Sequence, residues 1–337
     1  MRILVGCSGG LDSTFAAKLL AKEHEVCGAS LIMNDHTDIK VAADSCAALG
    51  IPFVSVDVRD LFEKHVVENF VDEYAKARTP NPCVVCNRFV KIAALCDYAK
   101  KHGFDRIATG HYCKVINENG RYCVVRASDD RKDQSYMLWY LDQEQLSMLV
   151  TPLSDSNKED VRESARRDGL KAAEQKESQD ICFIPDGDYI SFIEKRKGSF
   201  PEGNFIDKEG NVLGRHKGII NYTVGQRKGL GIALGQPMFV TALNVDDNTV
   251  TLSPAGGEYM DSVKASNLVF QALSPGEGIF NDLTVKLRYA AKPVPCSVEI
   301  IGDCANVKLA LPQRAVTPGQ SAVFYDGNKV AFGGFID

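Results

Sequence analysis

Short, almost continuously apolar runs alternate with amphipathic stretches along the first 110 residues. The apolar runs predict β-strands at residues 3–7, 26–33, 53–58 and 106–109. The amphipathic stretches carry apolar residues at intervals of three and four, and they predict helices at residues 14–23, 39–49 and 89–102. Gly50 and Gly103 lie where the last two helices would end. Apolar strands separated by helices predict an α/β fold, with a doubly wound parallel sheet covered on both faces.

The pattern changes after residue 110. Residues 113–116 and 122–126 flank Asn119-Gly120, a dipeptide that is typical of a tight β-hairpin. Helical spacing then returns at residues 135–141, 143–150 and 158–168. We therefore expect an antiparallel hairpin followed by a mostly helical extension.

Beyond residue 197 glycines become frequent and helical spacing fades. Glu209-Gly210-Asn211 separates short apolar segments, and residues 225–235 are rich in glycine. Alternating strands are then predicted at residues 283–289, 296–301, 307–311 and 322–325. Short strands with Pro, Gly and Asp-Gly turns between them are typical of a small antiparallel barrel or sandwich.

A chain of 337 residues is long enough for two or three domains, each with its own core. The changes in pattern place the boundaries near residues 197 and 261. We expect the parallel-sheet domain at residues 1–197, a small central β-rich domain at 198–261, and a C-terminal antiparallel β-barrel at 262–337.

Composition narrows the class of protein. Hydrophobic residues make up 45% and charged residues 25%, which is typical of a soluble globular protein. The apolar run at the N-terminus is far shorter than a signal-peptide core, and no later window approaches roughly 18 uncharged apolar residues. We therefore expect a cytoplasmic protein with no membrane association.

The cysteine count and the net charge add two constraints. Eleven cysteines in a chain without a secretion signal argue for buried thiols and a few reactive ones rather than a disulfide framework. A formal net charge of −5 argues against a uniformly basic nucleic-acid binder, because phosphate contacts need clustered Lys and Arg. Any RNA site must therefore be local.

One polar, glycine-rich string joins the first predicted strand to the first predicted helix. It comprises Gly6, Cys7, Ser8, Gly9, Gly10, Leu11, Asp12 and Ser13. Backbone amides at a helix N-terminus bind anions, and glycines let phosphate oxygens approach the main chain. Ser8 and Ser13 can add hydroxyl donors, while Asp12 can hold magnesium or orient the loop. A tight turn capped by Asp12 is the alternative interpretation.

Walker and dinucleotide-binding loops are excluded, because Gly-Lys-Ser/Thr and Gly-x-Gly-x-x-Gly are both missing from this string. The string resembles the Ser-Gly-Gly-x-Asp-Ser loop of the ATP pyrophosphatase superfamily. These enzymes cleave ATP between the α and β phosphates and adenylate an acceptor. The resemblance implies ATP and magnesium, but it leaves the acceptor open.

A second string, Thr79-Pro80-Asn81-Pro82-Cys83-Val84-Val85-Cys86-Asn87, joins two helical segments. Asn87 is placed to cap the following helix, so Cys86 would lie near a helix N-terminus. There the helix dipole would favour the thiolate and lower the pKa of Cys86. A buried cysteine pair or half of a zinc site are the alternatives, although no second Cys-x-x-Cys follows. Cys182, in a short apolar run, is by itself typical of a core residue.

Six separate strings, in the same order, closely resemble the tRNA-specific 2-thiouridylases, the MnmA or TrmU family. They lie at residues 79–87, 108–112, 132–136, 178–184, 225–231 and 316–322. The resemblance covers nearly the whole chain. It implies an adenine nucleotide alpha hydrolase-like catalytic domain at residues 1–197, tRNA contacts in the central domain, and a terminal barrel on the tRNA.

The resemblance also implies the activity, which is ATP-dependent adenylation of the C2 carbonyl of the wobble uridine followed by sulfur transfer. The products would be 2-thiouridine, AMP and pyrophosphate. Cys86 matches the nucleophile, and Cys182 matches the cysteine that carries a persulfide from a sulfur-donor protein, such as a cysteine desulfurase or a sulfur-relay carrier. A Cys86–Cys182 disulfide would remain after the transfer. The backbone at Leu31 and Gly110 would hold the nucleotide.

The remaining positions are implied by the same resemblance. Those facing the target base are Asn81, Pro82 and Cys83. Those contacting tRNA are His111, Lys132, Asp133, Gln134, Arg288, Tyr289 and Gln320.

Cys83 departs from the family pattern, because many members have an aspartate there that is interpreted as a general acid/base. A thiol does not substitute cleanly for a carboxylate in proton transfer. Cys83, Cys86 and Cys182 together would also suit an iron–sulfur cluster with one iron free to bind sulfide. A cluster route to the same product is therefore an alternative. Another ATP-pyrophosphatase synthetase and a non-catalytic RNA-binding module are two more.

Overall fold

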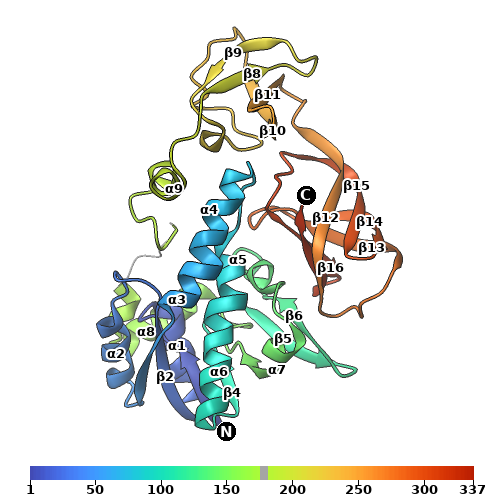
Figure 1. Cartoon of the computed structure of the whole chain (residues 1–337). Helices are drawn as coiled ribbons and strands as arrows, with labels where there is room; N and C mark the ends of the chain where they lie inside the picture. Colours follow the sequence, from blue (N-terminus) through green and yellow to red (C-terminus); the bar gives the residue numbers. More distant parts are fainter. Residues whose placement is uncertain (175–180) are drawn as a thin grey trace.

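The computed structural model describes residues 1–174 and 181–337 of the chain. Figure 1 shows three bodies: a mixed helix-and-sheet body from blue to green, a small yellow sheet and an orange-to-red barrel. Helix α4 (Glu68–Ala75) rises from the first body toward the small sheet. Within the described residues, no helix combines the length and apolarity that a membrane crossing requires.

The first body is built on a parallel sheet with the strand order β3-β2-β1-β4-β7. Its strands are β1 (Arg2–Gly6), β2 (Glu25–Ile32), β3 (Phe53–Asp57), β4 (Arg106–Ala108) and β7 (Leu149–Val150). The predicted parallel α/β sheet is confirmed. Residues 149–150 were predicted as helix, and this is wrong, because they pair with Ile107 and Ala108 and extend the sheet. A two-residue strand is too short to show its own periodicity.

The helices beside this sheet are α1 (Leu11–Leu20), α2 (Ile39–Ala48) and two longer composite helices. The first composite joins α3 (Arg59–Phe62), η1 (Glu63–Val67) and α4; the second joins α5 (Pro82–Cys86), η2 (Asn87–Lys91) and α6 (Ile92–His102). The elements η1 and η2 are π-helical turns, a geometry that is frequent at functional sites.

The second composite helix corrects the predicted start at residue 89. It begins at Pro82, whose ring favours the first helical position. Asn87 has helical angles, φ −59° and ψ −46°, so it lies inside the helix and does not cap it. Its side-chain amide donates instead to the Met137 carbonyl at 3.0 Å.

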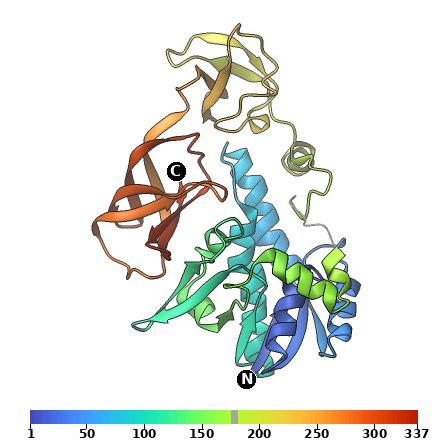
Figure 2. The ribbon, with the colours of Figure 1, turned by 180° about the vertical axis from the view of Figure 1, so that it is seen from behind.

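The predicted hairpin is confirmed as β5 (Cys113–Glu118) and β6 (Arg121–Arg126). Asn119 and Gly120 take the positive φ angles, 54° and 83°, that a tight turn requires. The extension contains η3 (Ser135–Leu138), α7 (Gln143–Met148), α8 (Lys158–Arg167) and η4 (Lys171–Glu174). Seen from behind, α8 lies against the blue helix α1 (Figure 2).

Helix α9 (Tyr189–Lys197) leads to the central four-stranded sheet, in the order β10-β11-β8-β9. Its strands are β8 (Gly203–Ile206), β9 (Val212–His216), β10 (Met238–Asn244) and β11 (Thr249–Pro254), and a short 3-10 turn, η5 (Ile219–Asn221), follows β9. The core of this sheet also takes Phe70 and Val71 from α4 and Ile193 from α9. These helices therefore anchor the central sheet to the first body.

The C-terminal strands close into an antiparallel barrel in the order β12-β15-β14-β13-β16-β17, with β17 pairing back to β12. They are β12 (Tyr259–Phe270), β13 (Gly278–Lys286), β14 (Val294–Ile301), β15 (Cys304–Arg314), β16 (Ser321–Asp326) and β17 (Lys329–Ile336). The predicted barrel is confirmed. Lys329 of β17 pairs with Val125 of β6, so the hairpin of the first body continues the barrel sheet.

Candidate active site

The turn between β1 and α1 is shaped by its own hydroxyl groups. Ser13 Oγ accepts from the Ser8 main-chain N–H at 3.2 Å and donates to the Gly10 carbonyl at 3.1 Å. Gly9 has φ +79°, and a Cβ there would lie 2.7 Å from the side chain of Val41. Gly10 is the N-cap of α1 and gives no side-chain cap, so the first amides of the helix keep their capacity to bind an anion.

Asp12 orients this loop. Its two carboxylate oxygens lie 2.6 and 2.5 Å from the Nζ of Lys158, and the Tyr112 hydroxyl donates to one of them at 2.8 Å. Of the two roles predicted for Asp12, orientation of the loop is the one that these contacts favour. Lys158 was not predicted, because it lies 146 positions along the chain from Asp12.

Gly110, two residues after the end of β4, packs against the loop. A Cβ at this position would lie 2.6 Å from the carbonyl carbon of Asp12 and 2.7 Å from the nitrogen of Ser13. Only glycine therefore allows this approach. Leu31 lies near the end of β2, paired with Val56 of β3. The loop, Gly110 and Leu31 thus lie at the carboxyl edge of neighbouring strands, where α/β sheets bind ligands.

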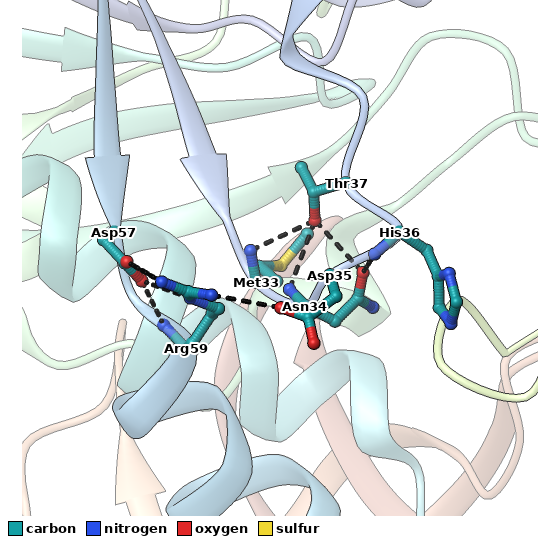
Figure 3. Close-up of polar contacts among 7 residues, drawn as sticks. All are labelled: Met33, Asn34, Asp35, His36, Thr37, Asp57 and Arg59. Carbon is teal, nitrogen blue, oxygen red and sulfur yellow. Dashed lines mark hydrogen bonds and ion pairs between the residues drawn. The ribbon is translucent and has the colours of Figure 1, made fainter.

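The segment after Leu31 is held by a polar network (Figure 3). The Thr37 hydroxyl accepts from the main-chain N–H groups of Met33 and Asn34, each at 3.2 Å. Arg59 pairs with Asp57 at 2.7 Å and reaches Asp35 at 3.0 Å. The ion pairs of Arg59 therefore hold the loop after β2 against the end of β3, at the carboxyl edge of the sheet.

Cys86 lies within the composite helix and is 4% exposed, whereas Cys83, one turn earlier, is exposed. Burial raises the pKa of the Cys86 thiol to about 11, while the charge of Lys91 lowers it. The predicted lowering of this pKa is wrong, because Cys86 is buried inside a helix rather than exposed at its N-terminus. Negative charge on Cys182 or Cys83 raises the Cys86 pKa further, so the three thiols are electrostatic neighbours.

Cys182 is exposed, and its neighbour Phe183 anchors its segment. The Phe183 ring packs edge-on against Phe62 at 5.6 Å and Phe70 at 5.3 Å between ring centroids. Cys86 belongs to the same apolar cluster as Phe62 and Phe183. This packing brings the Cys182 segment to Cys86. Ser178, Gln179 and Asp180, which belong to the same sequence string, lie outside the described residues.

Lys91 is the positive group at the thiols. Its pKa is raised by the charge of Cys86 above all, then by those of Cys83 and Cys182, against the opposing effect of burial. The π-turn η2 ends at Lys91, five residues after Cys86, and the Lys91 main-chain N–H bonds to the Cys86 thiol. A spacing of five does not belong to α-helical periodicity, so the sequence pattern did not indicate this role.

An iron–sulfur cluster does not fit this arrangement. Across residues 1–174 and 181–337, no three His, Cys, Asp or Glu side chains converge as a metal site would require. Cys83, Cys86 and Cys182 share an electrostatic neighbourhood but do not form a ligand set.

Asn81 is the N-cap of α5, and Pro82 is the first residue of that helix. Pro80 and Asn81 line a cavity of about 430 Å³ together with Phe89, Tyr140 and other residues. The barrel holds this loop, because Gln320 Nε2 donates to the Thr79 carbonyl at 2.8 Å. The Thr79 N–H donates to the Pro318 carbonyl, also at 2.8 Å. Gln320 and the loop facing the expected base position are therefore in direct contact.

The other expected tRNA positions differ in exposure. Asp133 is 3% exposed, and its carboxylate accepts from Ala127 and Ser135, so it supports the fold. Gln134 accepts from the Tyr112 N–H at 2.9 Å, and Lys132 is half-buried. Tyr289 is exposed.

Two of these positions, His111 and Arg288, have lowered pKa values. Burial lowers the pKa of His111 to about 3, with the charge of Lys91 adding to the effect, so the ring is neutral near pH 7. Its Nδ1 lies 2.8 Å from the Thr109 hydroxyl. Burial also lowers the pKa of Arg288, whose guanidinium donates to the Ala315 carbonyl.

Comparison with known proteins gives consistent matches over the whole chain. Three family models match: the tRNA methyl transferase HUP domain at residues 1–186, the tRNA methyl transferase PRC-barrel domain at 190–254, and the Aminomethyltransferase beta-barrel domain at 261–336. Proteins described as tRNA-specific 2-thiouridylase MnmA are similar in sequence. That of Acetivibrio thermocellus is 41% identical over 99% of both chains.

The corresponding protein of Clostridium perfringens is 39% identical over 100% of this chain and 98% of its own. That of Geotalea uraniireducens is 41% identical over 100% of this chain and 95% of its own. Full-length identity at this level, together with the loop and the neighbouring thiols, leads to one conclusion. The chain belongs to the tRNA-specific 2-thiouridylase family.

Proposed function

We propose that the protein is an ATP-dependent tRNA uridine 2-sulfurtransferase that makes 2-thiouridine at the wobble position. One observation carries the proposal: a preshaped phosphate loop and two neighbouring thiols, Cys86 and Cys182, occur in one domain of a chain from this family. The loop supplies ATP chemistry, and the thiols supply a path for sulfur.

The first step is adenylation. The C2 carbonyl oxygen of uridine is a poor leaving group, so it first attacks the α-phosphate of ATP and releases pyrophosphate. Residues 6–13 bind the phosphates, and the backbone at Leu31 and Gly110 holds the nucleotide. Magnesium would enter with the phosphates, which supply oxygen ligands of the kind that it prefers.

The second step transfers sulfur. Exposed Cys182 accepts sulfur from a donor protein, and the terminal sulfur of its persulfide attacks C2 and displaces AMP. The Cys86 thiolate then attacks the sulfur atom of Cys182, which frees 2-thiouridine and leaves a Cys86–Cys182 disulfide. The two thiols lose two electrons and the transferred sulfur gains them, so an external dithiol must reduce the disulfide before the next cycle.

The base must leave the anticodon stack to reach these thiols. We propose that Asn81, Pro82 and Cys83 face the base. The proposed tRNA contacts are His111, Lys132, Asp133, Gln134, Arg288, Tyr289 and Gln320. Exposed Tyr289 suits stacking on a base, whereas the buried Asp133 would contribute through its main chain.

The presence of both neighbouring thiols and the phosphate loop favours this function over the alternatives. An ATP-pyrophosphatase synthetase or a methyl transferase needs neither Cys86 nor Cys182. A non-catalytic RNA-binding module needs no phosphate loop. The cluster route lacks a converging ligand set among the described residues.

Pyrophosphate release separates these functions. We expect the protein to release pyrophosphate from ATP only when tRNA is added, with no amide donor present. Cys86→Ser and Cys182→Ser should both stop thiolation, while Cys304→Ser, in the barrel, should leave it unchanged. Pyrophosphate release at the same rate with and without tRNA would overturn the proposal. Full thiolation by Cys86→Ser or by Cys182→Ser would overturn it as well.

A further inference from the structure

The phosphate loop carries no positive charge of its own. Residues 6–13 contain neither Lys nor Arg, and Asp12 places a carboxylate among groups that would receive a triphosphate. Two like charges a few ångströms apart repel strongly at a partly buried site. A loop of this composition therefore needs a cation from elsewhere in the fold.

Lys158 supplies that cation. Its Nζ lies within 2.6 Å of one Asp12 carboxylate oxygen and 2.5 Å of the other. The Lys158 side chain is 11% exposed and that of Asp12 32%. The Lys158 Nζ lies over the Tyr112 ring, 5.4 Å from the ring centroid. The Tyr112 hydroxyl donates to the Asp12 carboxylate. The ammonium, the carboxylate and the phenol thus form one compact group at the loop.

The fold fixes the position of Lys158. It is the first residue of α8, directly after the N-cap Asn157, whose side chain accepts from the Glu159 N–H at 2.8 Å. Val161 and Ala165 of α8 pack with Leu11 and Phe15 of α1. The start of α8 is therefore held beside the start of α1, where phosphate would bind.

We propose that Lys158 is a positioning residue of the ATP site, where it neutralises Asp12 and fixes its carboxylate so that the loop accepts phosphate. This inference rests on the proposed function, in which residues 6–13 bind ATP. Removing the ammonium leaves a partly buried, uncompensated carboxylate, which is costly and repels the nucleotide. Removing both charges relieves the repulsion.

The chain provides a matched control on the same pair of helices. Lys18, in the last turn of α1, pairs with Asp168 just beyond α8. This second lysine–aspartate pair also joins α1 to α8, but it lies at the end of α1 away from the loop. A purely structural role for Lys158 would make Lys158→Met and Lys18→Met behave alike.

The test is the dissociation constant of a non-hydrolysable ATP analogue, measured by calorimetry with and without magnesium. We expect Lys158→Met to weaken binding by about tenfold or more. Lys158→Arg and Lys18→Met should stay within about threefold of the wild-type value. The double variant Asp12→Asn/Lys158→Met, measured without magnesium, should recover most of the loss.

Each failure has a distinct meaning. If the wild-type protein does not bind the analogue, the proposed function falls. If it binds and Lys158→Met binds equally well, or if the double variant stays as weak as Lys158→Met, the role of Lys158 is overturned. Should Lys158→Met fail to fold, the double variant carries the test, because it has no unpaired charge. Its binding must then lie within about threefold of wild type.

Discussion

Cys86 is a buried thiol beside an ammonium, and the two effects on its pKa oppose each other. Burial dominates and raises the pKa to about 11, so the thiol is protonated near neutral pH. The thiolate is the reactive form. We expect alkylation of Cys86 by iodoacetamide, followed by mass spectrometry, to accelerate with pH up to about 11. A rate that levels off below about pH 8 would contradict this assignment.

The charge of Lys91 should lower the pKa of Cys86. Lys91→Met removes the charge that lowers the Cys86 pKa, so the pKa should rise and alkylation at a fixed pH should slow. A rise of about one pKa unit makes the rate about tenfold lower. Lys91→Arg should keep the wild-type pH profile, and Lys101→Met, on the exposed end of α6, is the control. An unchanged profile in Lys91→Met would rule out the charge effect.

Some of these residues were predictable from the sequence and others were not, and the difference has physical reasons. The loop from Gly6 to Ser13 is contiguous, so its chemistry was visible in the sequence. The string from Thr79 to Asn87 made Cys86 a candidate nucleophile, with a buried cysteine pair or half of a zinc site as the alternatives, whereas Cys182 was visible only through resemblance to a family. Lys91 acts across a π-turn and Lys158 across a long separation in sequence, and neither arrangement leaves a periodic signal.

At the scale of elements, the end of β4 and the start of α1 must approach closely. Gly110→Ala would place a Cβ 2.6 Å from backbone atoms of Asp12, and no side-chain rotation relieves such a contact. We expect ATP-analogue binding to weaken by at least about tenfold, or about 1.4 kcal/mol. Calorimetry measures it, and Gly276→Ala, where a Cβ meets nothing within 4 Å, is the control. Wild-type affinity in Gly110→Ala would place the nucleotide elsewhere.

Helices and strands with a clear apolar pattern were predictable from the sequence, whereas helices interrupted by π-turns were not. Strands β1 to β4 and the hairpin with Asn119-Gly120 were predicted within a few residues. The composite helix from Arg59 was not predicted, and the one from Pro82 was started late. Both contain π-turns that break the three- and four-residue spacing.

At the scale of the whole molecule, the barrel contacts the loop that contains Thr79 and precedes α5. Gln320→Ala removes the donor to the Thr79 carbonyl, a bond worth about 1 kcal/mol. We expect slower thiolation with unchanged binding of the ATP analogue, because Gln320 is a proposed tRNA contact and not a proposed ATP contact. The control is Gln313→Ala, because the Gln313 amide donates to the Leu311 and Pro312 carbonyls of its own strand, and this variant should leave both unchanged. Equal effects of the two variants would exclude a specific role for Gln320.

Helical spacing stops and glycine becomes frequent at definite places in the sequence, and these places suggest three units. We propose units at residues 1–197, 198–261 and 262–337. Helix α9 ends at Lys197, and β12 begins at Tyr259, before the proposed start of the third unit. The contacts between the units were not predictable, since Gln320 and Thr79 lie far apart in the sequence.

The central claim is that this protein makes 2-thiouridine in tRNA. Unmodified tRNA would be incubated with the protein, ATP, magnesium, a persulfide donor and a dithiol, then digested to nucleosides for mass spectrometry. We predict 2-thiouridine at the wobble position, formed only with ATP and lost in Cys86→Ser and Cys182→Ser. Absence of 2-thiouridine from the wild-type reaction, with the protein folded and binding ATP, would contradict the account.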